Sequence, residues 1–229
     1  MKVNAKKSVG RPRLSEVTTD ISARQEILEA SAKLFAENGF KGTTTRKIAD
    51  EVGIRQPSLF HYFKRKEDIL FELVHTGSKD VLDYIEQVKF LGNPALSLYV
   101  LILRDCYFFM TEPLAINQLM NLPEVRNGKL KGIVDGTRAK SQQCYQQLVV
   151  AGIQEGQFIE KILDEVTANT LKGMSESLGA WYDKDGTKEH AVDTAIQIAD
   201  IGLRSLLKSK EELHLIRDLA LGEIGWSTK

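Results

Sequence analysis

The apolar positions between residues 43 and 66 fall into two short groups that flank Gly53. Each group has the spacing i, i+1 and i+4, which places its members on one face of a helix. These positions are Ile48, Ala49 and Val52 in the first group and Leu59, Phe60 and Phe63 in the second. The pattern predicts two short helices joined by a tight turn. Such a helix-turn-helix can place its second helix in the major groove of DNA.

The polar positions of the second predicted helix indicate which side chains could contact DNA. At about 100° per residue, the apolar group points one way, and Pro57, Ser58 and His61 point the opposite way. Tyr62 lies on the flank of the helix and Gln56 at its start. Their hydroxyl, amide and imidazole groups suit base edges and phosphates. An ordinary surface helix would show the same spacing, so the pattern alone leaves both interpretations open.

An apolar stripe upstream predicts a helix that covers this pair. Its members are Ile27, Ala30, Leu34 and Phe35. The Asn38-Gly39 pair is expected to end this helix, because glycine readily takes the left-handed conformation at the C′ position. A three-helix head of this size has little core of its own, so we expect the rest of the chain to support it.

The apolar positions after residue 66 also recur at helical spacing. The predicted helices cover about 66–91, 94–110, a short segment between Pro113 and Pro123, 129–155, 160–182 and 189–208. Gly77 lies inside the first of these helices, where a glycine lowers the helix propensity and favours a bend. No segment alternates convincingly between apolar and polar residues. The chain is therefore predicted to be all-α.

Charge divides the chain in two, although the whole is neutral with 31 basic and 31 acidic residues. Residues 1–66 hold 14 Lys and Arg against 7 Asp and Glu, and residues 67–229 hold the remaining 17 against 24. Arg11 and Arg13 flank a proline in the basic segment 1–20, and such an arm can lie in a narrow minor groove. Taken alone, the arm could equally be a solvated tail. Beside a helix-turn-helix, the charges favour a basic DNA-binding head on an acidic body.

Residues from about Arg24 to Leu73 resemble the DNA-binding domain of the TetR (tetracycline-repressor) family of transcriptional regulators. The matching segments are 27–30, 34–40, Thr43-Thr44, Ile48-Ala49, 52–54, 59–63, Lys66-Glu67 and Ile69-Leu70. The resemblance implies an all-α chain, in which a three-helix helix-turn-helix domain precedes a helical-bundle domain that binds a ligand and dimerises. We expect a flexible arm at 1–20, the DNA-binding domain at 21–66, and the ligand-binding and dimerisation domain at 67–229.

Position by position, the resemblance implies a set of DNA contacts near the starts of three helices. The set comprises Thr44, Thr45, Arg46, Gln56, Pro57, Ser58, His61, Tyr62 and Lys66. Arg55 stands where the family commonly has a capping Ser. It loses a cap worth about 1 kcal/mol and adds a charge that seeks phosphate. Pro57 and Arg65 also depart from the common residues, so the operator sequence does not follow from the family pattern.

The resemblance also implies a homodimer with a twofold axis, formed through the helices at about 160–182 and 189–208. Two heads on such an axis require a palindromic DNA operator. Both helices mix small residues with branched apolar ones, which permits close helix packing. For each residue taken singly, a place in the monomer core is an equal alternative.

For the body, the resemblance implies a small-molecule effector in a cavity among the central helices. Aromatic and Met residues with little charge nearby predict a largely apolar pocket. The candidates are Tyr99, Leu103, Tyr107, Phe108, Met110, Met120, Met174 and Trp181. Each could equally be plain core. The run 181–186 is similar to a turn in lipid-catabolism regulators of the family, some of which respond to acyl-CoA, but it also has a purely structural explanation.

The chain shows no convincing catalytic, metal or cofactor motif. Ser205 and Lys208 have the spacing of a nucleophile pair but lack its companion motifs. Cys106 and Cys144 have no metal or redox spacing, and no signal peptide or long apolar span is evident. We expect a cytoplasmic regulator that has no enzymatic activity, cofactor or membrane partner. A repressor released by a ligand is the first hypothesis, and a regulator without an inducer, or an activator, is the alternative.

Overall fold

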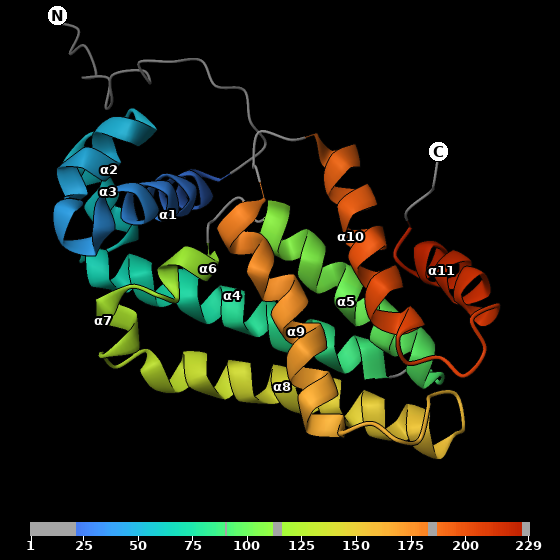
Figure 1. The fold of residues 1–229 in the computed structure, drawn as a ribbon. Helices are drawn as coiled ribbons and strands as arrows, with labels where there is room; N and C mark the ends of the chain where they lie inside the picture. Colours follow the sequence, from blue (N-terminus) through green and yellow to red (C-terminus); the bar gives the residue numbers. More distant parts are fainter. Residues whose placement is uncertain (1–21, 90, 112–115, 183–186, 226–229) are drawn as a thin grey trace, which may run out of the picture. The chain divides into compact units, whose positions relative to one another are not determined.

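The computed structural model describes residues 22–89, 91–111, 116–182 and 187–225 (Figure 1). These residues form helices and connecting turns, and no β-strand occurs among them. Phe158 and Leu207 form an isolated antiparallel bridge only. The all-α prediction is confirmed. Arg11 and Arg13, the arginines of the expected DNA-binding arm, lie outside the described residues.

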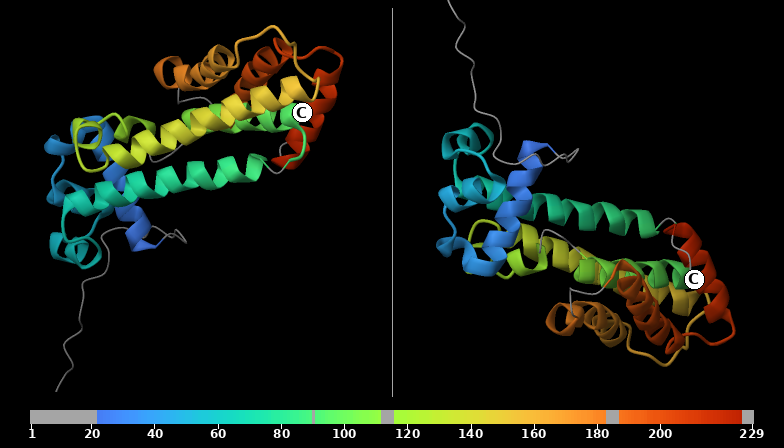
Figure 2. Two further views of the ribbon diagram at one scale, coloured as in Figure 1. Left: turned by 90° about the horizontal axis from the view of Figure 1, so that it is seen from below. Right: turned by 90° about the horizontal axis from the view of Figure 1, so that it is seen from above.

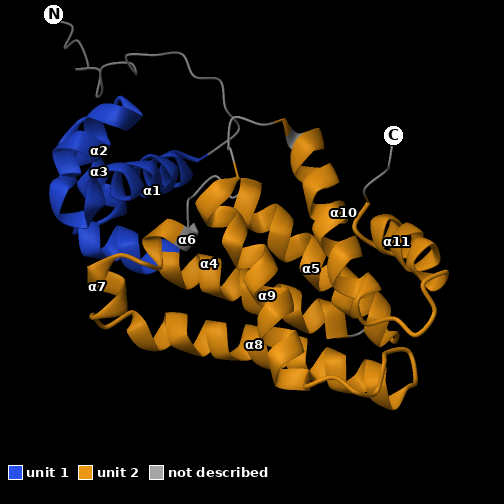
Figure 3. Cartoon of the chain, in the orientation of Figure 1, with its two compact units in different colours: residues 1–73 blue, residues 74–229 orange. Residues whose placement is uncertain are grey.

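The chain divides into two compact units between Leu73 and Val74 (Figure 3). This division falls inside α4 (Lys66–Lys89), which continues through Gly77. The expected domain boundary was at the start of the same helix. The first unit is the head of the molecule and the second is the body.

The head consists of α1 (Ala23–Gly42), α2 (Thr45–Val52), α3 (Gln56–Tyr62) and the first part of α4. The Ser22 side chain caps α1 by accepting a hydrogen bond from the Gln25 backbone N–H. Gly39 has φ 71°, so the expected stop appears as a kink, after which α1 runs to Gly42.

The head core gathers apolar side chains from all four helices. Its fully buried members include Ile27, Phe35, Ile48, Leu59 and Ile69. The prediction that Phe60 shares the buried face of α3 is wrong, because its side chain is 38% exposed. Phe60 follows Leu59 by one residue, and about 100° of rotation turns it away from the core on so short a helix.

The body is built around α5 (Pro94–Thr111). Its other helices are α6 (Ile116–Leu119), α7 (Pro123–Arg126), α8 (Lys131–Gln154), α9 (Asp164–Trp181), α10 (Lys188–Arg204) and α11 (Glu212–Glu223). Helix α5 packs against α8, α9, α10 and α11 (Figure 2). Among the described helices, α5 alone is long and apolar enough to cross a membrane, but 61% of it is buried within the structure. A core helix has the same properties.

The predicted body helices match α5, α6, α8, α9 and α10, with ends that differ by a few residues. Two further helices were not predicted. Helix α7 is only four residues long. Helix α11 buries Leu213, Ile216 and Ala220 against the core at helical spacing.

Candidate nucleic-acid interface and ligand cavity

The turn between α2 and α3 depends on Gly53. This residue is left-handed, with φ 73° and ψ 26°, and its N–H donates to the carbonyls of Ala49 and Asp50. A residue with a β-carbon is strained in that conformation. The structure confirms the tight turn that the sequence predicted, and it brings the starts of α2 and α3 together.

The caps of these two helices differ. The Thr44 hydroxyl accepts a hydrogen bond from the Lys47 backbone N–H over 3.2 Å and caps α2. Arg55 precedes α3 and provides no side-chain cap, as expected from the sequence, while Pro57 occupies the first turn of α3. Before α4, the Asp68 carboxylate accepts a hydrogen bond from the Arg65 backbone N–H over 3.0 Å.

The expected DNA contacts fall on two helix starts and on the outer face of α3. Side chains with a large exposed fraction are Thr44, Arg46, Arg55, Pro57, His61 and Tyr62. Thr45, Gln56 and Ser58 are half-buried. The Gln56 amide donates from Nε2 to the Thr45 hydroxyl over 2.8 Å, which ties the start of α3 to the start of α2. These nine positions are the candidate DNA contacts of the head.

Lys66 has a structural contact that the sequence did not reveal. Its Nζ donates to the Phe40 carbonyl over 2.8 Å and to the Thr43 carbonyl over 3.0 Å. The ammonium also lies 4.2 Å from the centroid of the Phe40 ring. In this arrangement Lys66 closes the C-terminal end of α1, where carbonyl groups lack helical partners.

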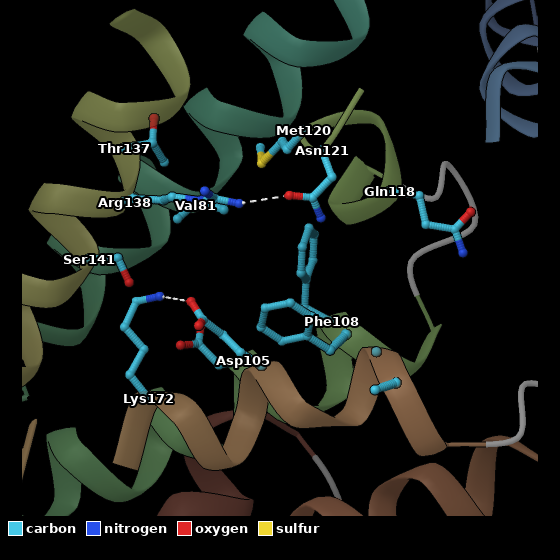
Figure 4. A pocket seen from close by; sticks show the side chains of 14 residues that line it. Val81, Asp105, Phe108, Gln118, Met120, Asn121, Thr137, Arg138, Ser141 and Lys172 are labelled. Atoms are coloured by element: carbon cyan, nitrogen blue, oxygen red, sulfur yellow. Dashed lines mark hydrogen bonds and ion pairs between the residues drawn. The ribbon is translucent and has the colours of Figure 1, made fainter. Parts of the chain in front are cut away.

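A cavity of about 520 Å³ lies in the body (Figure 4). Its lining comes from five helices and the segment after α6. Val81 comes from α4, Phe108 from α5, Arg138 from α8 and Lys172 from α9. The lining mixes apolar side chains with charged ones.

Two of the expected ligand-binding residues, Phe108 and Met120, line this cavity. The other candidates lie elsewhere. Tyr99, Leu103 and Met110 are buried in the body core. Tyr107 and Met174 are half-buried and pack against that core, and the Trp181 side chain is 61% exposed.

The Tyr99 hydroxyl has a structural partner away from the cavity. It donates to Asp200 Oδ1 over 2.7 Å, and Arg217 Nε donates to the same oxygen over 3.0 Å. This cluster joins α5, α10 and α11. It explains why an aromatic residue on α5 is buried without lining a pocket.

Asp105 is a charged lining residue that the sequence analysis did not select. Its Oδ2 accepts a hydrogen bond from the Tyr145 hydroxyl over 2.8 Å. Burial raises the pKa of this carboxyl to about 6, although the Tyr145 bond and the Lys172 charge oppose the rise and Glu176 adds to it. Lys172 forms an ion pair with Glu176, which also lines the cavity.

The two cysteines are free and buried. Burial raises the pKa of the Cys106 thiol to about 12 and that of the Cys144 thiol to about 11. Both therefore remain protonated at neutral pH and are weak nucleophiles. Among the described residues, no group of His, Cys, Asp and Glu is placed to hold a metal ion.

Two family models match the chain. One, for bacterial regulatory proteins of the tetR family, matches residues 27–73. The other, for the tetracyclin repressor-like C-terminal domain, matches residues 120–206. The matches fall on the helix-turn-helix of the head and on most of the body helices.

The relatives of the chain are regulators as well. It is 24% identical over 172 residues to the HTH-type transcriptional repressor KstR2 of Rhodococcus jostii, covering 72% of this chain and 81% of the relative. It is 49% identical over 75 residues to KstR2 of Mycobacterium tuberculosis, covering 32% of this chain and 37% of the relative. The second alignment thus spans about a third of either protein.

Solved structures share the fold. The ketosteroid transcriptional regulator KstR2 of Mycobacterium tuberculosis has a TM-score of 0.73 at 23% identity, covering 82% of this chain and 96% of that one. AibR in complex with isovaleryl coenzyme A and operator DNA has a TM-score of 0.63 at 23% identity, covering 81% and 98%. At these identities the likeness concerns the fold alone.

Proposed function

Because the chain belongs to the tetR family of bacterial regulatory proteins, we propose that it is a transcriptional repressor that a small ligand releases from a palindromic operator. The helix-turn-helix is the observation that carries this proposal. Helix α3 exposes Pro57 and His61 and leaves Ser58 half-buried beside them, and the family model matches the same segment. Base edges in the major groove are read by such side chains.

A homodimer through α9 and α10 accounts for apolar side chains that the body leaves exposed. Leu163 and Val166 are exposed at the start of α9, Trp181 at its end, and Ile201 on α10. Between the ends of α9, the outward positions include the small residues Gly173 and Ser177. A second copy that covered this face would relate the two heads by a twofold axis. The operator would then be palindromic.

The cavity supports a response to a small molecule. Its volume of about 520 Å³ lies within the range of about 300–1,000 Å³ that is typical of ligand pockets. Val81 of α4 lines the cavity, and α4 continues without a break into the head. A ligand that favours another position of α4 would change the spacing of the two heads and release DNA.

We expect the effector to be small and largely apolar, with acyl-CoA and other lipid-like molecules as one class. The isovaleryl coenzyme A complex of AibR, a protein of the same fold, motivates that class. The alternative is a regulator without an inducer, or an activator, whose body serves only for dimerisation. The cavity favours the ligand-responsive form. We expect the protein to act in the cytoplasm, where DNA is, and to catalyse no reaction.

Operator release is tested with duplexes that the full chain selects from a randomised pool. Fluorescence anisotropy measures binding to a selected duplex with and without a panel of acyl-CoA thioesters, fatty acids and apolar ring compounds. At least one compound should weaken binding about tenfold or more, which corresponds to a coupling of about 1.4 kcal/mol. If every compound leaves the affinity unchanged, the inducer-free alternative replaces the proposal.

Dimerisation is tested with a matched pair of substitutions. Ile201 on α10 and Leu215 on α11 are 63% and 62% exposed, and only Ile201 lies on the proposed interface. Ile201→Glu should produce monomers in light scattering, while Leu215→Glu should leave dimers. Equal behaviour of the two variants would contradict the interface.

A further inference from the structure

One wall of the cavity carries a cation that lacks an acidic partner. Arg138 lines the cavity from α8 and is half-buried. Its Nη2 donates to Asn121 Oδ1 over 3.3 Å, and within the described part of the chain it forms no ion pair. Its charge also lowers the pKa of Asp135, but that carboxylate is paired with Lys131. Most of the guanidinium donors of Arg138 are thus free to bind a ligand.

Ser141 lies one turn after Arg138 on the same face of α8. It is 7% exposed, and its side chain points into the cavity (Figure 4). Its hydroxyl has no hydrogen-bond partner among the described residues. The neighbouring Thr137 differs, because its hydroxyl already donates to the Ile133 carbonyl over 2.9 Å. Since buried hydroxyls are usually hydrogen-bonded, Ser141 has a donor to offer a ligand.

The acidic side chains that line the cavity, Asp105 and Glu176, come from α5 and α9 rather than from α8. Lys172 pairs with Glu176, and its charge also lowers the pKa of Asp105. One ammonium thus serves two carboxylates, so this part of the wall is acidic at neutral pH. A bound anion would be repelled there and attracted to Arg138.

Apolar side chains complete the lining. Phe108 and Phe109 meet edge to face, with ring centroids 6.2 Å apart, and both line the cavity. Met120 and Val81 add further apolar surface. Figure 4 shows Phe108 and Met120 beside the cavity, with Arg138 and Ser141 along its α8 wall. The site can therefore hold a molecule that has an apolar body and one charged group.

We propose that the cavity binds an amphipathic anion, whose carboxylate or phosphate contacts Arg138 and Ser141 and whose apolar body packs on Phe108, Phe109 and Met120. This inference rests on the proposed function and specifies the chemistry of the effector. A free carboxylic acid and an acyl-CoA thioester both have the required anion. The experiment distinguishes these two sources.

Isothermal titration calorimetry of the full chain at pH 8 uses decanoate, decanoyl-CoA and the neutral 1-decanol, together with 2-naphthoate and 2-naphthol. At least one anion should bind about tenfold more tightly than its neutral counterpart, as a charge-assisted hydrogen bond to arginine requires. Tight decanoate or naphthoate binding indicates a free acid. Tight decanoyl-CoA binding alone indicates a thioester.

Arg138→Gln should abolish the preference for the anion and leave binding of the neutral compound unchanged. Arg126→Gln is the matched control, because Arg126 Nη1 donates to the same Asn121 oxygen over 3.2 Å but does not line the cavity. It should keep the preference. Ser141→Ala should reduce it about threefold. Arg138→Lys keeps the positive charge but loses the guanidinium that can donate two parallel hydrogen bonds, so it should retain a smaller preference for the anion. This variant replaces Arg138→Gln if Arg138→Gln does not fold.

Three results would overturn the inference: binding of no anion, equal binding of anion and neutral compound, or an unchanged preference in the Arg138 variants. The proposed function has a separate readout in these experiments. If a neutral compound binds and releases the selected duplex, the repressor remains ligand-responsive and only the anion site is wrong. If no compound of either kind binds or releases DNA, both fail.

Discussion

Lys66 and Phe40 form a two-point contact that closes the end of α1: the ammonium donates to the Phe40 carbonyl over 2.8 Å and lies 4.2 Å from the centre of its ring. The family resemblance implied that Lys66 contacts DNA. In the structure, the Lys66 ammonium stabilises the head through its contacts with the carbonyls of Phe40 and Thr43 and with the Phe40 ring. The two roles can be separated by measuring folding and DNA binding on the same variants.

Lys66→Met should lower the free energy of unfolding of the head by about 1–3 kcal/mol, because a charge-assisted hydrogen bond and a cation–π contact are lost. Lys64→Met is the control, since Lys64 is exposed two residues earlier. Urea denaturation followed by circular dichroism measures both. If Lys66→Met keeps full stability but weakens binding to every duplex, Lys66 acts mainly on phosphate.

Ser58→Ala and His61→Ala should change which duplexes are preferred, because helical periodicity turns both side chains away from the apolar face of α3. Arg46→Ala should weaken binding to all duplexes alike, since a phosphate contact carries no sequence information. Selection from a randomised pool followed by sequencing compares the variants. A uniform loss for all three would show that α3 does not read bases.

Gly152→Ala should destabilise the body by about 1–3 kcal/mol. A β-carbon at this position of α8 would lie 2.2 Å from the Phe158 ring, which is fully buried. Gly136→Ala is the control in the same helix, because a β-carbon there meets no atom within 4 Å. It should stabilise the helix by up to about 1 kcal/mol. Opposite signs in thermal unfolding support the packing described for Phe158, and a neutral Gly152→Ala contradicts it.

Asp105 should make stability depend on pH. Its pKa is about 6 in the folded chain against an ordinary value of 3.8, so the folded state binds the proton more tightly. Stability must then fall as pH rises through this window, and the loss is complete at about pH 7, one unit above the folded pKa. Asp105→Asn keeps an acceptor for Tyr145 and removes the titration.

The free energy of unfolding of the Asp105→Asn variant should therefore be about 1–2 kcal/mol higher than that of the unmodified chain at pH 8 and almost the same at pH 4. The gain is modest because the carboxyl is only half-buried and solvent screens its charge. Urea denaturation at the two pH values measures the difference. Asp135→Asn is the control, because its pKa is lowered rather than raised. A loss of stability for Asp105→Asn at pH 8 would show that its charge is favourable.

The head could be predicted from sequence because its signals are local. Gly53, the apolar groups of α2 and α3, and the missing cap at Arg55 all act within a few residues. Phe60 shows the limit of that reasoning: spacing placed it on the buried face, but the narrow core contact of α3 left it exposed.

The cavity could not be predicted in the same way. Asp105, Arg138 and Lys172 come from α5, α8 and α9, and only the packing of these helices brings them to one space. Periodicity shows which face of a helix is buried but not what lies opposite. The sequence therefore did not distinguish Phe108 from Tyr99, which are both aromatic residues of α5. Phe108 lines the cavity, whereas the Tyr99 hydroxyl donates a hydrogen bond to Asp200 in the core.

The central claim is that this chain reads a DNA sequence as a dimer. The most direct test is selection of duplexes from a randomised pool by the full chain, followed by anisotropy and mass measurements on the enriched duplex at fixed salt. The account predicts an enriched inverted repeat, bound by two protomers at least about 10³-fold more tightly than a scrambled duplex. Failure to enrich any sequence, or equal affinity for the scrambled duplex, would contradict it.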